Sequence, residues 1–302
     1  MMKFVPAALA AALMLAGCAS TPHSPTAAAP AAPVAVAAPA ATGPSADDNL
    51  NAVAWSQNAS EHDFIYLQTF RDAQEKLLKA KQDPNWDALP RDDRAAHASL
   101  KGLKPAVILD IDETVLDNSP YQARLIRAGG EFNEADWAAW CKEAIARPMP
   151  GALAFTKFAA DHGIAVFYIS NRAKDLQDAT LANLRSAGFP VAGTSSFLGL
   201  GTFVEGCEQV GSEKSCRRQR VAKDYRVLMQ FGDQISDFTD VPGNTAEGRA
   251  KAMAPYTDWI GTRWFVLPNP TYGAWESALF DNDFSLPRAE RRQKKIDALK
   301  VN

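Results

Sequence analysis

One stretch, residues 107–118, restricts the possible folds more than any other part of the sequence. It begins with aliphatic and β-branched residues that have no polar break, and it ends abruptly in the carboxylates of Asp110 and Asp112. Such a run predicts a strand that is buried on both faces and leaves a parallel sheet where the acidic residues begin. Because ligands of open α/β sheets bind at the carboxyl ends of the strands, we expect a functional site there.

Asp110 and Asp112 are two residues apart, so their side chains start on the same face while the chain stays extended. Two neighbouring carboxylates repel each other unless a cation or a shared proton relieves them. The pair therefore favours a Mg²⁺ site in which an aspartate attacks phosphorus and forms an aspartyl-phosphate. A second interpretation stays open, in which the acidic residues form a turn and cap the next helix.

Polar residues also follow a second apolar run, residues 166–169. Ser170 comes directly after it, where its hydroxyl could donate to a phosphoryl oxygen. A serine after a strand can equally cap a helix, and this alternative stays open. Asn171 and Arg172 follow as candidates to support either the phosphate or the carboxylates.

Three further residues complete the predicted phosphate site. Lys214 lies at the start of the basic segment 213–223, and one lysine is needed to offset the charge on the phosphoryl oxygens. Most of the other residues of the segment are expected to form a solvated face. Asp233 follows a third apolar run, residues 227–231, and Asp237 could meet it on one helical turn. Oxygen ligands without clustered His or Cys favour Mg²⁺ over zinc.

The segment of residues 118–150 lies between the first strand and the next βα unit, and it predicts a small, mainly helical cap. Caps exclude water and shape the substrate pocket. Its aromatic residues Phe132, Trp137 and Trp140 could instead pack the cap onto the sheet, and our interpretation gives one tryptophan to packing and one to the ligand. Tyr272, just past a fourth apolar run, is a candidate for stacking on a substrate ring or for loop packing.

Alternation of apolar runs with helical patterns predicts an α/β fold. Apolar residues at helical spacing predict an amphipathic helix over residues 55–82. Further helices are expected at residues 151–160, 175–188 and 288–301, whereas the glycine-rich residues 197–212 are expected to be irregular.

The N-terminal sequence predicts export. Residues 1–17 have the basic start and short apolar core of a signal peptide, and Leu-Ala-Gly-Cys resembles the bacterial lipoprotein cleavage box. That resemblance implies a lipid anchor at Cys18 and, with Ala19 after it, the outer membrane; an ordinary signal peptide is the alternative. Residues 18–45 are mostly Ala, Pro, Thr and Ser, and they predict a disordered tether. Residues 46–302 then form the globular domain.

Composition and cysteine usage limit the partners. The formal net charge is −3, which gives no electrostatic footprint for a nucleic acid polymer. An oxidising compartment makes a disulfide between Cys207 and Cys216 plausible, and Cys141 would remain as a buried thiol.

Four sites in the sequence, taken in order, resemble the motifs of the haloacid dehalogenase-like (HAD) hydrolases. They are the Asp110–Asp112 pair, Ser170, Lys214 and Asp233. More specifically, the chain resembles the class C acid phosphatases, the lipoprotein e type of 5′-nucleotidase. The resemblance rests on Ile-Leu-Asp-Ile-Asp-Glu-Thr at residues 108–114, Asp-Trp-x-x-Trp at 136–140, Gly-Asp-x-x-x-Asp-Phe at 232–238 and Leu-Pro-Asn-x-x-Tyr-Gly-x-Trp-Glu at 267–276. It implies a Rossmannoid parallel sheet with helices on both faces.

The resemblance also implies roles for individual residues. Asp110 would be the nucleophile, and Asp112 would be the general acid and then the general base. Mg²⁺ would be bound by the Asp110 carboxylate, the Asp112 backbone carbonyl and Asp233, with Asp237 nearby. Ser170 and Lys214 would complete the catalytic set.

The same family holds the base of a substrate between aromatic side chains, and Trp140 and Tyr272 match that role by position. Gln234 departs from the family, which usually has Asn in Gly-Asp-Asn. The longer amide of Gln234 is expected to change the geometry around the metal ligands, and the ligands themselves are expected to stay the same.

The sequence therefore predicts a Mg²⁺-dependent acid phosphatase or 5′-nucleotidase. Its predicted partners are a small phosphomonoester, such as a nucleoside 5′-monophosphate, nicotinamide mononucleotide or an aryl phosphate, and the membrane through Cys18; a homodimer is left open. Two alternatives remain: a non-catalytic surface lipoprotein that binds haem or a nucleotide, and a sugar-phosphate phosphatase.

Overall fold

The computed structural model describes residues 48–94 and 99–301. The predicted signal peptide, the lipid anchor Cys18 and the linker up to residue 45 lie outside the described residues, so they stay predictions. Among the described residues, no helix is both long and apolar enough to cross a bilayer.

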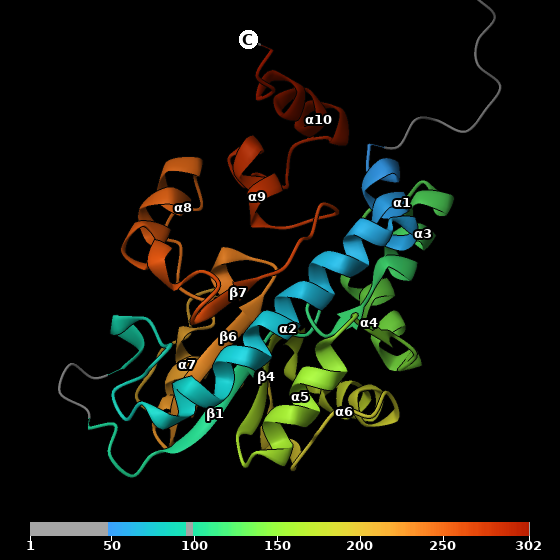
Figure 1. The fold of residues 1–302 in the computed structure, drawn as a ribbon. Helices are drawn as coiled ribbons and strands as arrows, with labels where there is room; N and C mark the ends of the chain where they lie inside the picture. The colour runs from blue at the N-terminus through green and yellow to red at the C-terminus, as the bar shows by residue number, and fades with distance from the viewer. Residues whose placement is uncertain (1–47, 95–98, 302) are drawn as a thin grey trace, which may run out of the picture. The chain divides into compact units, whose positions relative to one another are not determined.

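A five-stranded sheet forms the centre of the fold, with the strand order β5-β4-β1-β6-β7, and all neighbouring strands are parallel (Figure 1). The strands are β1 (Lys104–Leu109), β4 (Ala165–Ala173), β5 (Phe197–Leu200), β6 (Tyr225–Gly232) and β7 (Trp264–Val266). Leu109 at the end of β1 pairs with Tyr168 of β4 and Phe231 of β6. The three central strands therefore end at the same edge, and the predicted α/β fold is confirmed.

Helices surround this sheet. They are α1 (Leu50–Asn58), α2 (Ser60–Gln82), α3 (Ser119–Ala128), α4 (Glu134–Glu143), α5 (Ala152–Asp161), α6 (Gln177–Ser186), α7 (Ser215–Ala222), α8 (Ala246–Met253), α9 (Ala274–Ser277) and α10 (Arg288–Asp297). Short 3₁₀ turns are η1 (Arg91–Asp93), η2 (Lys174–Leu176), η3 (Thr194–Ser196), η4 (Ile235–Asp237), η5 (Ala254–Trp259) and η6 (Ala278–Phe280).

Alternate residues of β1 face the two hydrophobic cores of the domain, because successive side chains of a strand point to opposite faces. Val107 and Leu109 belong to the larger core with residues of α2 and α5, and Figure 1 shows α2 lying across the sheet. Ala106 and Ile108 belong to the second core with Val221 of α7. Helices thus cover both faces, as the family resemblance implied.

Two predicted elements differ from the structure. The single helix expected over residues 55–82 is divided into α1 and α2 at Ala59, whose φ of −84° and ψ of 122° are extended. The segment 197–212, expected to be irregular, begins with the edge strand β5. The strand was missed because it is short and contains Gly199, which weakens a strand pattern.

The expectation for the basic segment was wrong for two of its arginines. Arg217 and Arg218 of α7 have 0% of their surface exposed, although a run of charges usually marks a solvated face. Arg218 forms ion pairs with Asp93 and with Asp240, which come from distant parts of the chain. No local pattern could have predicted these partners.

The residues expected to form a cap contain α3 and α4, so this segment is mainly helical, as predicted. A two-stranded antiparallel ladder of β2 (Leu116–Asp117) and β3 (Arg147–Pro148) joins the two ends of this insertion. The backbone N–H of Met149 also donates to the carbonyl of Val115. The two ends of the insertion are therefore held together where they leave and rejoin the rest of the domain.

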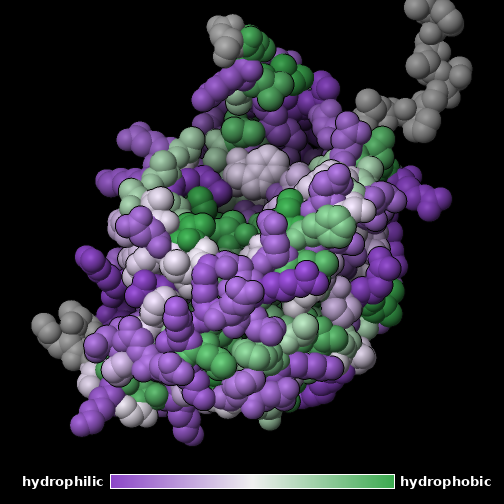
Figure 2. All heavy atoms as spheres, in the orientation of Figure 1, coloured by the Kyte–Doolittle hydropathy of each residue, from purple (hydrophilic) through white to green (hydrophobic). Residues whose placement is uncertain are grey.

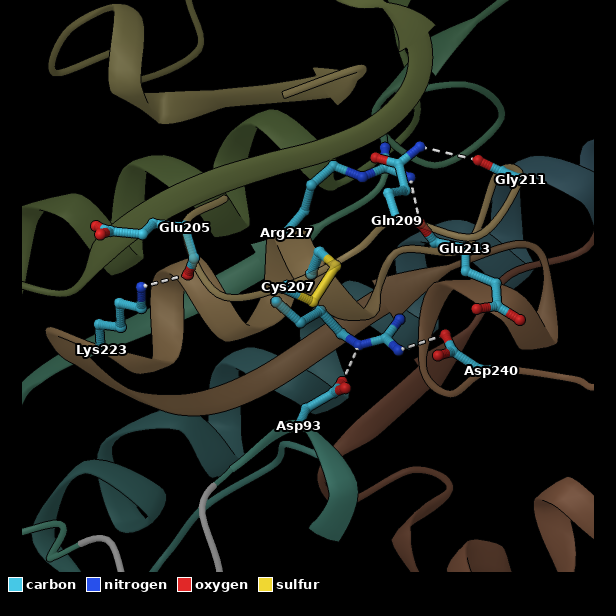
Figure 3. The surroundings of a disulfide bond; sticks show 11 residues. Asp93, Glu205, Cys207, Gln209, Gly211, Glu213, Arg217, Lys223 and Asp240 are labelled. Carbon is cyan, nitrogen blue, oxygen red and sulfur yellow. Dashed lines mark hydrogen bonds and ion pairs between the residues drawn. A yellow bond between two sulfur atoms is a disulfide. The ribbon is translucent and has the colours of Figure 1, made fainter. Parts of the chain in front are cut away.

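The cysteines are arranged as the sequence suggested. Cys207 and Cys216 form a disulfide that joins the loop after β5 to α7 (Figure 3). Cys141 is a buried free thiol, and burial raises its pKa to about 12. Within the described residues, this disulfide is therefore the only covalent bond between cysteine side chains.

Candidate active site

Three carboxylates meet at the carboxyl edge of the sheet. Asp110 directly follows β1, Asp233 directly follows β6, and Asp237 ends the 3₁₀ turn η4. One oxygen of each carboxylate lies within 4.8 Å of the others. This is the convergence that the sequence predicted from the separate strand ends.

The ammonium group of Lys214 lies among these carboxylates. Its Nζ donates to Asp110, to Asp237 Oδ1 at 2.7 Å and to the carbonyl of Ile169 at 2.9 Å. Burial lowers the pKa of Lys214, but the two carboxylates outweigh this effect and raise the pKa above its ordinary value. Lys214 is therefore positively charged at neutral pH.

The carboxylate groups themselves are crowded. Burial raises the pKa of Asp110 well above its usual range, and the neighbouring Asp237 adds to that shift. Burial and then Asp237 likewise raise the pKa of Asp233 to about 7. One ammonium group cannot balance three carboxylates, so a cation at this point would relieve the remaining repulsion.

The donor set fits a hard divalent cation. All three groups offer carboxylate oxygens, and His and Cys take no part in the cluster. The side chain of Asp112 lies outside this cluster, and the family resemblance implied only its backbone carbonyl as a ligand. Asp110, Asp233 and Asp237 are thus the side chains that could bind the metal.

Asp112 has different partners. Its Oδ1 accepts hydrogen bonds from Arg172 Nε at 2.9 Å, Arg172 Nη2 at 2.8 Å and Asn118 Nδ2 at 2.9 Å. Its Oδ2 lies 3.3 Å from the hydroxyl of Ser170. Arg172 was predicted to support either the phosphate or the carboxylates. Its side chain is 1% exposed and donates to Asp112, so in the structure it supports a carboxylate. Asn171 is exposed, and its side-chain oxygen accepts from Arg217 at 2.7 Å.

The two tryptophans of the insertion differ in exposure. Trp140 is 3% exposed, and its Nε1 donates to Asn118 Oδ1 at 2.7 Å. Trp137 is partly buried, with the guanidinium of Arg172 over its ring at 5.5 Å. Trp140 is therefore part of the support of Asp112, and Trp137 is the better placed of the two to reach a ligand.

Several residues of the site were missed from the sequence. Glu113 has a φ of +57° and accepts hydrogen bonds from the hydroxyl of Tyr272 and from the backbone N–H of Asn118. Tyr66 of α2 donates to the carbonyl of Glu113 at 2.5 Å. Glu113 and Asn118 lay inside the motif already singled out, whereas Tyr66 gave no signal because it fitted the apolar pattern of a core helix.

Comparisons with known proteins show the family of this chain. The family model described as HAD superfamily, subfamily IIIB (acid phosphatase) matches residues 40–275. The chain belongs to this family. The class C acid phosphatase of Bacillus anthracis has a similar structure, with a TM-score of 0.71 and 33% sequence identity over 84% of this chain and 97% of that chain. A second structure of that protein holds tungstate.

Three plant proteins are also similar to this chain. A stem 31 kDa glycoprotein of Glycine max is 30% identical over 55% of this chain and 58% of its own length. Acid phosphatase 1 of Solanum lycopersicum is 26% identical over 55% of this chain and 57% of its own length. Vegetative storage protein 2 of Arabidopsis thaliana is 28% identical over 55% of each chain. The chain thus spans less than two thirds of the length of these curated relatives.

Gln234, the departure from the class C acid phosphatases, supports the acidic cluster. Its Nε2 donates to Asp233 Oδ2 at 2.7 Å, and its backbone N–H donates to Asp237 Oδ2 at 2.8 Å. Asn269 Nδ2 donates to the same oxygen of Asp233 at 2.9 Å. Gly273 leaves room for the longer amide, because a Cβ there would lie 2.3 Å from Gln234 Oε1.

Gly232→Ala tests how tightly the acidic cluster is packed. A Cβ at Gly232 would lie 2.2 Å from Asp237 Oδ2, so Asp237 must move. We expect a loss of about 1–3 kcal/mol in the free energy of unfolding, measured by chemical denaturation. Gly193→Ala is the matched control, because no atom lies within 4 Å of its added Cβ, and its effect should stay within about 0.5 kcal/mol. Equal stability of the two variants would contradict this packing.

Proposed function

We propose that this chain is a Mg²⁺-dependent acid phosphatase that hydrolyses small phosphomonoesters through an aspartyl-phosphate. The observation that carries the proposal is the cluster of Asp110, Asp233 and Asp237 around Lys214 at the carboxyl edge of the sheet. Phosphoryl transfer depends mainly on positioning and on offsetting charge on the phosphoryl oxygens. A buried ammonium group among carboxylates that bind a divalent cation is suited to that task.

Asp110 is the nucleophile in this proposal. Its carboxylate would attack phosphorus and displace the alcohol, which leaves the phosphoryl group on Asp110. Lys214 would offset the charge on the equatorial oxygens, and Ser170 would donate its hydroxyl to one of them. Bound Mg²⁺ would supply further offset of negative charge at the three aspartates.

Asp112 is the general acid and then the general base. Arg172 and Asn118 hold its Oδ1, while Oδ2 has only the Ser170 hydroxyl at 3.3 Å among its hydrogen-bond partners in the described part of the chain. Oδ2 would therefore give its proton to the leaving alcohol. The same oxygen would then take a proton from the water that hydrolyses the aspartyl-phosphate.

The first prediction from this proposal concerns Asp110→Asn. The variant should keep the fold and lose p-nitrophenyl phosphate hydrolysis by a factor of at least ~10³, because an amide cannot replace the nucleophile. Hydrolysis by the unsubstituted protein should stop in EDTA and return with added Mg²⁺. Asp161→Asn, at the exposed end of α5, is the control and should stay active. Substantial Mg²⁺-dependent hydrolysis by Asp110→Asn would refute the assignment.

The same assay decides the non-catalytic alternative. A relative named as a storage protein belongs among the similar proteins, so the activity of this chain needs a direct test. A chain that only binds a ligand would leave p-nitrophenyl phosphate intact with or without EDTA.

The second prediction concerns the substrate. We propose 5′-nucleotides, nicotinamide mononucleotide and aryl phosphates, because Trp137, Tyr272 and the partly exposed Trp275 provide aromatic surface near the site. Figure 2 shows the surface hollowed beside α9, the helix that carries Trp275. Turnover of nicotinamide mononucleotide and AMP should exceed that of a hexose phosphate. The opposite order would favour a sugar-phosphate phosphatase.

The third prediction concerns location. We propose that the lipidated Cys18 anchors the enzyme to the outer membrane, on the basis of the Leu-Ala-Gly-Cys sequence. Cys18→Ser should move the protein from the membrane fraction to the soluble fraction of a bacterial host, with its phosphatase activity per molecule unchanged. An unchanged membrane fraction would contradict the anchor.

A further inference from the structure

The segment that carries Lys214 has little regular structure of its own. Residues 207–214 lie between β5 and α7 without a strand or helix, and Val210 is 64% exposed. Lys214, at the end of this segment, is nevertheless 3% exposed and contacts Asp110 and Asp237. Something outside the segment must fix its path, because an exposed loop by itself does not hold a buried ammonium group in place.

Arg217 joins this segment to the end of β4. Its Nη2 donates to the carbonyl of Ser212 at 3.1 Å and to that of Glu213 at 2.9 Å, the two residues before Lys214. Its Nη1 donates to the carbonyl of Ser170 at 2.6 Å, and Nη2 also donates to Asn171 Oδ1 at 2.7 Å. One guanidinium group therefore connects the backbone beside Lys214 to the backbone of Ser170.

The partners of Arg217 are unusual for a buried arginine. Its side-chain acceptors are three backbone carbonyls and one amide oxygen, and its Nε has no hydrogen-bond partner within the described residues. The neighbouring Arg218 pairs instead with Asp93 and Asp240, which lie on the other side of α7 in Figure 3. Burying a charge without a carboxylate partner is costly, so stability alone does not explain Arg217.

The disulfide fixes the other end of the same segment. It joins Cys207, where the segment begins, to Cys216, the residue before Arg217. The segment is thus closed into a loop, and Arg217 binds the part of the loop nearest Lys214 (Figure 3).

We propose that Arg217 is a positioning residue that holds Lys214 and Ser170 in one fixed arrangement, with the Cys207–Cys216 disulfide restricting the loop between them. The inference rests on the proposed phosphatase function. Arg217 does not touch the three clustered carboxylates; it acts through the backbone on either side of the phosphoryl position.

A double-mutant cycle between Arg217→Met and Lys214→Met tests this role with p-nitrophenyl phosphate. Arg217→Met keeps the volume of the side chain but removes its donors. We expect kcat to fall by ~10- to 100-fold, with a smaller change in KM, because a small displacement of a catalytic group costs that much. In the Lys214→Met background the same change should cost less than in the unsubstituted protein, because only the part of the effect that acts through Ser170 remains and residues that act through one another are not additive.

Two further variants sharpen the cycle. Arg217→Lys keeps the charge but cannot bridge both backbones, so its kcat should lie between those of Arg217→Met and the unsubstituted protein. Arg220→Met is the matched control, because Arg220 on the same helix forms an exposed pair with Asp224. Equal losses from Arg217→Met in both backgrounds, or full activity of Arg217→Lys, would overturn the inference. If Arg217→Met does not fold, Arg217→Lys takes its place in the cycle.

Amide hydrogen exchange separates the two proposals. Residues 207–214 should exchange faster in Arg217→Met than in Arg220→Met, whether or not the protein is active. An inactive unsubstituted protein would refute the phosphatase function, and the exchange comparison would then decide the role of Arg217. Equal exchange in both variants would show that Arg217 does not hold the loop.

Discussion

The structure depends on the crowding of three carboxylates, two of them buried and one partly buried, around one ammonium group. Asp110, Asp233 and Asp237 would repel one another without Lys214, and even with it the pKa values of Asp110 and Asp233 are raised, first by burial. Such an arrangement persists only if contacts with the surrounding residues hold the carboxylates in place. Gln234, by its side chain and its backbone N–H, provides part of that support.

Two aspartates of one strand end have separate environments. Asp110 meets Lys214, whereas Asp112 meets Arg172 and Asn118. Glu113, the residue after Asp112, lies in the left-handed region of backbone conformation, where a non-glycine residue is uncommon. Tyr66 and Tyr272 hydrogen-bond to Glu113 and so secure this conformation. Neighbouring carboxylates in different surroundings can perform different chemistry.

The sequence predicted the parts of the fold whose signal is local. The runs before Asp110 and Asp233 were apolar enough to indicate central strands, and parallel packing then requires their ends to meet. It could not predict β5, whose short pattern is interrupted by Gly199. It could not predict the burial of Arg217 either, because this depends on contacts with Ser170 and Asn171, which are distant in the sequence. Trp140 was matched to substrate stacking by position, but its burial depends on how the insertion folds back onto Asn118.

The predicted cap is connected to Asp112 through Asn118 and Arg172. Trp140 of α4 donates to Asn118, which in turn donates to Asp112, and Arg172 contacts Asp112 while lying over the ring of Trp137. A rigid movement of α4 away from the sheet would break the hydrogen bond to Asn118 and change the surroundings of Asp112. The position of α4 therefore affects the position of Asp112 through Asn118.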